Sequence, residues 1–302
     1  MSSTTLGVIG AGRVGAVLAA ALADTYRVVA CSGDSDASRT RIETLLPGVL
    51  RTDPHTVARS VDVLLLAVPD DALPGVVEDL AAAGSITAGQ VVVHVSGRNG
   101  VGVLSPARAL GARTVALHPA MTFTGTYVDL DRLEGCVMAL TTDPSAREVG
   151  ERLVAALGGR LTWVEEERRS TYHAALAHGA NHLTTVVTQA MDLLRQAGAD
   201  DPSGTLRPLL TAALDNALAY GDAALTGPVV RGDVTTVQAH LTALHEALAS
   251  TVDSYLAMAR ATADRAVADG RLDPERARAI TDELDTAVWE ATAAALAPPA
   301  GR

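Results

Sequence analysis

The stretch that decides the fold is Leu6-Gly7-Val8-Ile9, which runs directly into Gly10-Ala11-Gly12-Arg13-Val14-Gly15 and the helix-like residues Ala16 to Leu22. A G-x-G-x-x-G sequence is informative here because it follows a strand pattern and opens a helix pattern, as the dinucleotide-binding fingerprint requires. Gly10 would permit the tight turn, Gly12 the close approach of a pyrophosphate, and Gly15 the close packing of helix on strand. The alternative is a glycine-rich turn that binds no ligand.

Up to about residue 165 the chain alternates short β-rich runs with helix-like stretches, the pattern of stacked βαβ units. Most strand candidates are continuous apolar runs, which indicates burial on both faces. They are Gly7–Ile9, Arg27–Cys31, Val61–Val68, Gln90–Val95, Thr114–Leu117, Gly135–Leu140 and Arg160–Val164. Helices are expected at Val14–Ala23, Ser38–Leu46, Pro74–Ala82, Gly102–Leu110 and Ser145–Leu157. The sequence predicts an α/β domain over 1–165, a doubly wound parallel sheet of the Rossmann kind.

After residue 165 the strand signals stop. The charged junction Glu165–Ser170 is interpreted as a solvated helix start or linker. Helices are then expected at Thr171–Ala197, Pro202–Ala224, Val234–Ala268 and Pro274–Ala297, because Gly, Pro and Asp mark the breaks between them. We expect an all-α domain over 166–302 that closes a substrate site and forms a homodimer.

Composition narrows the classes of function. A chain of 302 residues favours about two domains, and a net charge of -11 argues against a nucleic-acid partner. All 24 basic residues are Arg, which excludes a lysine as acid, base or Schiff-base former. No apolar run suffices for a membrane span, the first residues lack a basic signal-peptide region, and the two cysteines are interpreted as buried free thiols. We therefore expect a cytoplasmic protein that is not bound to a membrane.

The end of the second strand usually decides which dinucleotide binds. Ser32 stands where an NAD enzyme would carry Asp or Glu, and Arg39 and Arg41 follow shortly. An acid would accept from a ribose hydroxyl, whereas an arginine accommodates a 2′-phosphate, so the sequence favours NADP. Alternatively Asp34 takes the ribose and both arginines are ordinary solvated helix residues.

The ends of the third and fourth long strands are expected to line the same crevice, because ligands bind at the carboxyl ends of parallel strands. Val68-Pro69 would shape the wall at the nicotinamide end. Ser96 offers a hydroxyl to cofactor or substrate, or else caps its loop. His94, inside the fourth strand, is expected to be structural.

Two further regions carry groups suited to chemistry. His118 follows a strand at its carboxyl end and is expected in the substrate pocket. His173 and Asn181 lie eight positions apart on the predicted first helix of the second domain, on one face, with a small residue between them. His178 and His182 form another i, i+4 pair, but no companion Glu or Cys cluster supports a metal site, and none is expected.

The loop Leu225–Asp233 carries the last candidates. Asp233 is placed to cap the following helix. Arg231, in a glycine-flanked position, could bind a substrate carboxylate or pair with Asp233.

These residues together resemble a family of predicted oxidoreductases with a Rossmann-like domain and a helical domain of unknown function, number 2520. The resemblance rests on the glycine run, Ala67–Asp70, Val95–Gly97, His118-Pro119, His173 with Asn181, and Thr226-Gly227-Pro228 with Arg231-Gly232-Asp233. The wider group, the superfamily of proteins like the C-terminal domain of 6-phosphogluconate dehydrogenase, is similar to pyrroline-carboxylate reductases and to ketopantoate reductases, including a divergent class of the latter.

The resemblance implies an NADPH-dependent reductase of a small 2-oxo acid, with 2-dehydropantoate as first candidate substrate and pantothenate biosynthesis as its setting. Ordinary ketopantoate reductases place a catalytic lysine two turns before an asparagine, and the match through Asn181 puts His173 at that position. His173 would then donate the proton and Asn181 orient the substrate, with Ser96, His118 and Arg231 completing the pocket. The alternatives are an imine reductase of the pyrroline-5-carboxylate type, a prephenate-type dehydrogenase and a non-catalytic NADP-sensing protein.

Overall fold

The computed structural model describes residues 4–296 of the chain, with side-chain burial up to residue 286. It divides into two compact units, Met1–Gly179 and Ala180–Arg302. The first unit extends beyond residue 165 because the segment after the last strand packs on the sheet domain. There Glu166 accepts hydrogen bonds from the backbone N–H groups of Val101 and Gly102, at 2.7 and 2.9 Å.

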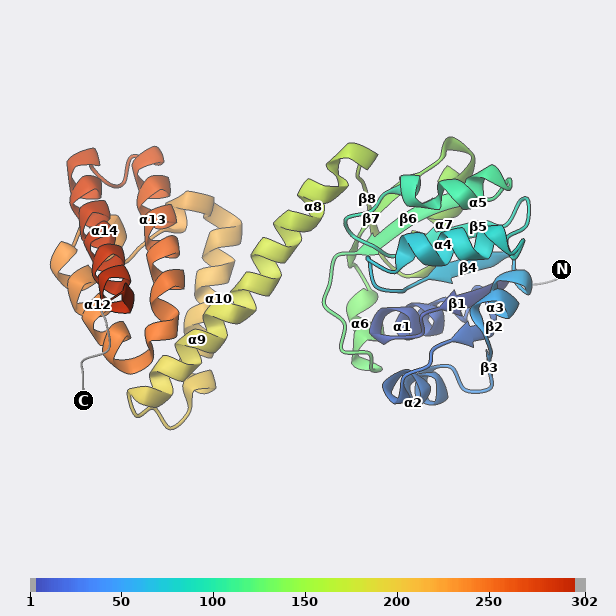
Figure 1. The fold of residues 1–302 in the computed structure, drawn as a ribbon, viewed down its shortest axis with the longest axis horizontal. Coiled ribbons are helices and arrows are strands. Elements are labelled where there is room, and N and C mark those ends of the chain that lie inside the picture. The colour runs from blue at the N-terminus through green and yellow to red at the C-terminus, as the bar shows by residue number, and fades with distance from the viewer. Residues whose placement is uncertain (1–3, 297–302) are drawn as a thin grey trace. The chain divides into compact units, whose positions relative to one another are not determined.

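Within residues 4–179 the chain builds an eight-stranded sheet of order β3-β2-β1-β4-β5-β6-β7-β8 (Figure 1). The strands are β1 Thr5–Ile9, β2 Arg27–Ser32, β3 Leu50–Arg51, β4 Val63–Leu66, β5 Val91–His94, β6 Arg113–Pro119, β7 Val137–Thr142 and β8 Arg160–Trp163. From β3 to β6 all neighbours are parallel, so the carboxyl ends of these strands lie at one edge. This confirms the doubly wound fold predicted from the glycine run.

One neighbour pair departs from the expected parallel sheet. β7 runs antiparallel to β6, with Leu117 opposite Leu140. The chain between Pro119 and Val137 stays at the carboxyl edge of β6, where the short helix α6, Val128–Leu133, contacts α1. Two neighbouring strands can be parallel only if a crossover segment runs back along the sheet between them. Because no such segment connects β6 to β7, β7 must be antiparallel to β6.

Helices cover both faces of the sheet, and each face has its own apolar core. On one face α1 (Arg13–Leu22), α2 (Asp36–Leu45) and α7 (Arg147–Ala156) pack on alternate strand residues such as Val8 and Leu65. On the other face α3 (Pro54–Arg59), α4 (Leu73–Ala82) and α5 (Ser105–Ala109) pack on residues such as Leu64 and Val92. All residues of β4 and β5 are buried, as their continuous apolar runs predict.

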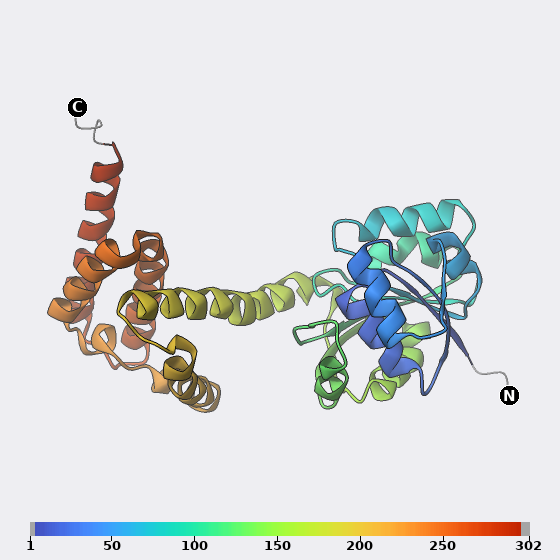
Figure 2. The same cartoon turned by 90° about the horizontal axis from the view of Figure 1, so that it is seen from below.

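The described part of the second unit consists of helices (Figure 2). After α8 (Arg169–Leu176) and a π-helical turn, Ala177–Asn181, they are α9 His182–Gln196, α10 Pro202–Tyr220, α11 Pro228–Arg231, α12 Val234–Leu248, α13 Val252–Ala268 and α14 Pro274–Leu296. Their core contains Val237, Leu256, Ala263 and Ile280. Among the described residues, no helix combines the length and apolar character of a membrane span.

Two expectations for these helices were wrong. The predicted helix over 234–268 is two helices, because Leu248 leaves helical geometry and Thr251 Oγ1 donates to its carbonyl oxygen at 2.7 Å. The predicted loop over 225–233 contains the single turn α11, which Gly232 ends in the left-handed conformation.

Candidate active site

The three glycines of the fingerprint have distinct surroundings. Gly10 has φ +89°, and a Cβ there would lie 2.7 Å from the carbonyl oxygen of Ala67. A Cβ on Gly15 would lie 2.3 Å from the carbonyl oxygen of Gly10, so this position is packed against the turn. Above Gly12 the nearest atom would be 4.0 Å away. The turn therefore needs Gly10 and Gly15 for its own geometry, whereas Gly12 leaves open space where a ligand can approach.

The amino end of α1 is available to an anion. The helix begins at Arg13, and its N-cap, Gly12, supplies no side-chain acceptor for the first N–H groups. The first turn holds no acidic residue, so the positive end of the helix dipole is not compensated locally. Arg13 is exposed and Val14 half-buried. A Cβ on Gly125 would lie 3.1 Å from the Arg13 Cα and 2.5 Å from the Arg41 Nε, so Arg41 borders this helix end.

The end of β2 meets the glycine turn, as predicted. Ser32 is buried, and its carbonyl oxygen accepts from the N–H groups of Gly10 and Ala11 at 3.2 and 2.8 Å. Arg39, on the exposed face of α2, forms an ion pair with Asp36 at 3.3 Å. An exposed pair of this kind contributes little to stability, so a stronger anion could displace Asp36 from Arg39.

The end of β4 lies beside the same turn. Ala67 N donates to the carbonyl oxygen of Ile9 at 2.8 Å, and a Cβ on Gly10 would lie 3.0 Å from Val68 N. Val68 is half-buried and Pro69 exposed. The structure thus brings together the fingerprint and the Val68-Pro69 segment, which the sequence placed in one crevice.

His94 at the end of β5 is a structural residue, as predicted. Its ring is buried, with Nε2 2.8 Å from the carbonyl oxygen of Gly100 and Nδ1 accepting from Ser96 N at 3.1 Å. Burial lowers the pKa of His94 to about 4, which keeps the ring neutral. Ser96 caps the loop, because its hydroxyl accepts from both the backbone N–H and the side-chain amide of Asn99.

Three side chains converge above Gly97, and we call them the histidine cluster: His118, Tyr172 and His173. His118 Nδ1 lies 3.0 Å from the Tyr172 hydroxyl, and the rings of His118 and His173 are 6.1 Å apart and nearly perpendicular. A Cβ on Gly97 would lie 2.6 Å from His173 Cδ2 and 3.0 Å from His118 Nε2. The cluster therefore packs directly on the loop after β5, which only glycine allows.

The protonation states in the cluster follow from burial and a nearby cation. Burial lowers the pKa of His118 to about 4, helped by the charge of Arg169 and by His173. Burial also raises the pKa of Tyr172, so the phenol keeps its proton at neutral pH. His118 is therefore a neutral hydrogen-bonding group near pH 7.

Arg169 holds the strand ends beneath the cluster. It is 1% exposed, and its guanidinium donates hydrogen bonds to groups of β6, of β7 and of the loop after β5. Their acceptors are Thr141 Oγ1 at 2.9 Å and the carbonyl oxygens of Ser96 at 3.1 Å, Ala116 at 2.6 Å and Ala139 at 3.2 Å. Burial lowers its pKa to about 10, so it remains charged.

The interpretation of Glu165–Ser170 as a solvated helix start was correct for the helix and wrong for Arg169. Sequence reasoning missed this residue because a run of charged residues indicates a solvated surface. A signal was present, since Arg169 precedes Tyr172 and His173 by three and four positions. Arg169 therefore shares a helix face with His173, which was a candidate, and with Tyr172, which sequence reasoning also missed.

The remaining candidates belong to the second unit, and each unit is described by itself. Asn181 is exposed at the end of the π-helical turn, which the sequence did not reveal and which replaces the plain α-helical spacing from His173. Arg231 is exposed at the end of α11, and the ion pairs found among residues 4–286 do not include one with Asp233. Asp233 accepts from Thr236 N at 3.1 Å, which confirms it as the N-cap of α12.

The fold defines the class of protein: a Rossmann-like domain continued by a helical domain. Residues 2–119 match the family of the Rossmann-like domain, and residues 136–262 match the domain of unknown function DUF2520. The chain thus combines these two domains, as the resemblance of its motifs implied. No curated protein matches it.

Solved structures share the fold at low identity. A protein from Bacteroides fragilis, provisionally assigned as an NADP oxidoreductase, has a TM-score of 0.72 at 18% identity, over 86% of this chain and 98% of its own. An imine reductase from Pseudomonas sp. has 0.63 at 17%, over 95% and 100%. The pyrroline carboxylate reductase of Plasmodium falciparum, solved with NADP bound, has 0.55 at 14%, over 92% and 99%. At such identities the likeness establishes the fold.

Proposed function

We propose that this protein is an NADPH-dependent oxidoreductase. The observation that carries the proposal is the open space above Gly12, at an uncapped helix end, between two glycines that the turn itself requires. This is the geometry in which a helix amino end receives a pyrophosphate. The structural neighbours named for NADP or for reductase activity support it.

The preference for NADP over NAD rests on the end of β2. Ser32 brings no carboxylate to repel a 2′-phosphate, and its side chain is buried beside the turn. Arg39 is held only by an exposed ion pair, and Arg41 borders the amino end of α1. Either guanidinium can bind a phosphate in bidentate fashion. In this proposal the glycine run, Ser32, Val68-Pro69 and Ser96 hold the rest of the cofactor.

NADPH, when bound, supplies the hydride for the reduction. His173 donates the proton to the reduced atom, and the Tyr172 hydroxyl fixes the orientation of His118. His118, neutral at pH 7, contributes a hydrogen bond to the substrate.

Electrostatics around the cluster favour a neutral carbonyl with an attached carboxylate. The Arg169 guanidinium lies near the cluster and contributes, after burial, to the lowered pKa of His118. A nearby cation is compatible with an anionic oxo acid. We therefore propose a small 2-oxo acid as the substrate, with 2-dehydropantoate first.

Imine reduction is the second candidate, because the structural neighbours include an imine reductase and a pyrroline carboxylate reductase. An imine that arrives protonated needs no proton donor from the protein. The two candidates therefore differ in how strongly turnover depends on His173.

The test is NADPH oxidation with 2-dehydropantoate, other 2-oxo acids and cyclic imines, for wild type, His173→Ala and His245→Ala. His245 is an exposed histidine on α12 and serves as the control. We expect turnover of an oxo acid that falls about 100-fold in His173→Ala, the loss typical of a missing general acid, while NADPH affinity and His245→Ala stay unchanged. Turnover of imines alone, independent of His173, would favour the second candidate. Cofactor binding without any oxidation would contradict both and indicate an NADP-sensing protein.

A further inference from the structure

A second cavity lies in the first unit, at the edge of the sheet opposite to the glycine turn. Its volume is about 640 Å³, and its lining includes the first residues of three parallel strands, Val63 of β4, Val91 of β5 and Arg113 of β6. Residues of α7 complete one side. Because these strands are parallel, their first residues lie a full strand length from the carboxyl ends where the cofactor is proposed to bind.

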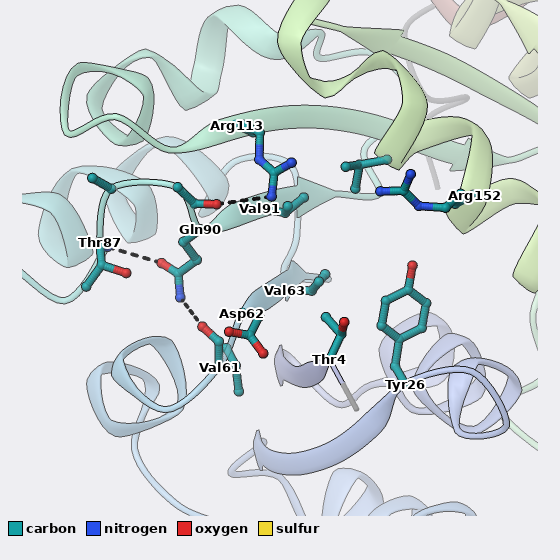
Figure 3. A pocket seen from close by; sticks show the side chains of 13 residues that line it. Thr4, Tyr26, Val61, Asp62, Val63, Thr87, Gln90, Val91, Arg113 and Arg152 are labelled. Carbon is teal, nitrogen blue, oxygen red and sulfur yellow. Dashed lines mark hydrogen bonds between the residues drawn. The ribbon is translucent and has the colours of Figure 1, made fainter. Parts of the chain in front are cut away.

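Arg113 lines this cavity with a guanidinium that makes few contacts with the rest of the protein. It is half-buried, and its recorded hydrogen bond is from Nη2 to the carbonyl oxygen of Gly89 at 3.2 Å. The ion pairs found among residues 4–286 do not include Arg113. A guanidinium has five N–H donors in a planar fork that fits a carboxylate, so most of its donors remain for a ligand (Figure 3).

Two further donors face the same space. Arg152 of α7 and the hydroxyl of Tyr26 are turned toward each other at one side of the cavity (Figure 3). Arg152 is paired with Glu148 one turn earlier on its own exposed helix face. Burial raises the pKa of Tyr26, so its phenol stays protonated and can donate a hydrogen bond.

Two further polar side chains of the lining, Gln90 and Asp62, are hydrogen-bonded to the protein. Gln90 is buried, and its amide donates to the carbonyl oxygens of Ala58 and Val61 at 2.7 and 2.8 Å. Asp62 Oδ2 accepts from both the N–H and the hydroxyl of Thr5 at 2.8 Å, and these bonds lower the pKa of Asp62. The wall is therefore held rigidly by its own hydrogen bonds.

We propose that this cavity is a binding site for a small organic acid. The carboxylate of the ligand bonds to Arg113, which has no ion pair among residues 4–286, and the Tyr26 hydroxyl and Arg152, which is shared with Glu148, are further donors. The volume lies within the range of small-molecule sites. The site is separate from the cofactor and from the histidine cluster, so its occupant is not the substrate of the proposed reduction.

Isothermal titration of the full chain tests this site with isovalerate, succinate and benzoate as probes, and with inorganic phosphate and the neutral isovaleramide for comparison. The variants are Arg113→Gln and Arg152→Gln. The matched control is Arg160→Gln, because Arg160 also opens a strand and also donates to a glycine carbonyl, that of Gly135 at 3.0 Å, outside the cavity. Arg152 is exposed, so its replacement leaves the fold intact even if Arg113→Gln should not fold.

At least one of the carboxylates should bind to wild type and to Arg160→Gln with equal affinity. It should bind about tenfold more weakly to either cavity variant, a loss of about 1.4 kcal/mol, while NADPH affinity stays the same in all four proteins. Absence of carboxylate binding, equal binding to the cavity variants, or competition with NADPH would overturn the proposal. Phosphate or isovaleramide binding as tightly as the carboxylates would refute the organic-acid class.

Discussion

At the scale of the residue, the three glycines of the fingerprint have different structural roles. Gly10 and Gly15 are required by the turn, since a Cβ on either would meet backbone within 2.7 Å. Gly12 is required by nothing within the chain, because its nearest neighbour would lie at 4.0 Å. The protein has room for a side chain at Gly12, so packing does not explain the glycine at this helix amino end. The simplest explanation is a ligand that must approach the backbone of Gly12 closely.

For the histidines, the sequence predicted the position but not the pKa. Position at a strand end was enough to select His118 and to expect a structural His94. The lowered pKa values depend on burial and on the charge of Arg169, and the sequence does not show how deeply these side chains are buried.

The two buried histidines predict a loss of stability in acid. For each, the pKa is lowered from 6.5 to about 4 by burial, so the unfolded chain binds protons that the folded chain does not. Their stabilising contribution is complete above pH 6.5 and is lost as the pH falls toward 4, by about 1.4 kcal/mol per histidine and pH unit. Urea unfolding at a series of pH values measures this. A free energy of unfolding that stays level between pH 6.5 and 4 would contradict the burial of both rings.

At the scale of the element, α8 is fixed to the sheet by its first residue. Arg169 bonds to carbonyl oxygens on β5, β6 and β7, so one side chain sets the start of the helix that carries Tyr172 and His173. A guanidinium has five N–H donors, so one buried arginine can satisfy several carbonyl groups at once.

Replacing Arg169 by Met should therefore destabilise the first unit strongly. The methionine fills the space but leaves buried carbonyl oxygens and the Thr141 hydroxyl without donors, at about 1–3 kcal/mol for each unsatisfied group. Arg168→Met is the control, because the neighbouring Arg168 is exposed. Chemical unfolding should separate the two variants by several kcal/mol. Equal stabilities would show that Arg169 does not hold the strand ends together.

Apolar runs predicted even the four-residue strands β4, β5 and β8, and breakers predicted α10 and α14. The helix predicted over 171–197 is α8, a π-helical turn and α9. The two-residue β3 and the six-residue α3 and α6 were missed, because they offer too few positions for a pattern. The break between α12 and α13 was not predicted, because the residues between these helices include neither Gly nor Pro. The direction of β7 depends on where the preceding segment packs, which local patterns do not encode.

At the scale of the whole molecule, the sequence predicted the domain order and the cofactor crevice, since both follow from the glycine run and the loss of strand signals. It selected His118 and His173, which the structure brings together, and missed Arg169, which is hidden in a charged run. Exposed apolar side chains on α9 and α10, including Leu183, Leu209 and Leu218, support the expectation of a homodimer. The homodimer stays a prediction.

Titration of NADPH and NADH onto wild type, Gly12→Ala and Gly15→Ala tests the central claim most directly. Wild type should bind NADPH about tenfold or more tightly than NADH, because an arginine near β2 bonds the 2′-phosphate. Gly12→Ala should keep its melting temperature and lose about tenfold in NADPH affinity, whereas Gly15→Ala should lose stability because its Cβ would lie 2.3 Å from the Gly10 carbonyl oxygen. A wild type that binds neither dinucleotide, or a Gly12→Ala variant that binds NADPH as tightly as wild type, would contradict the account.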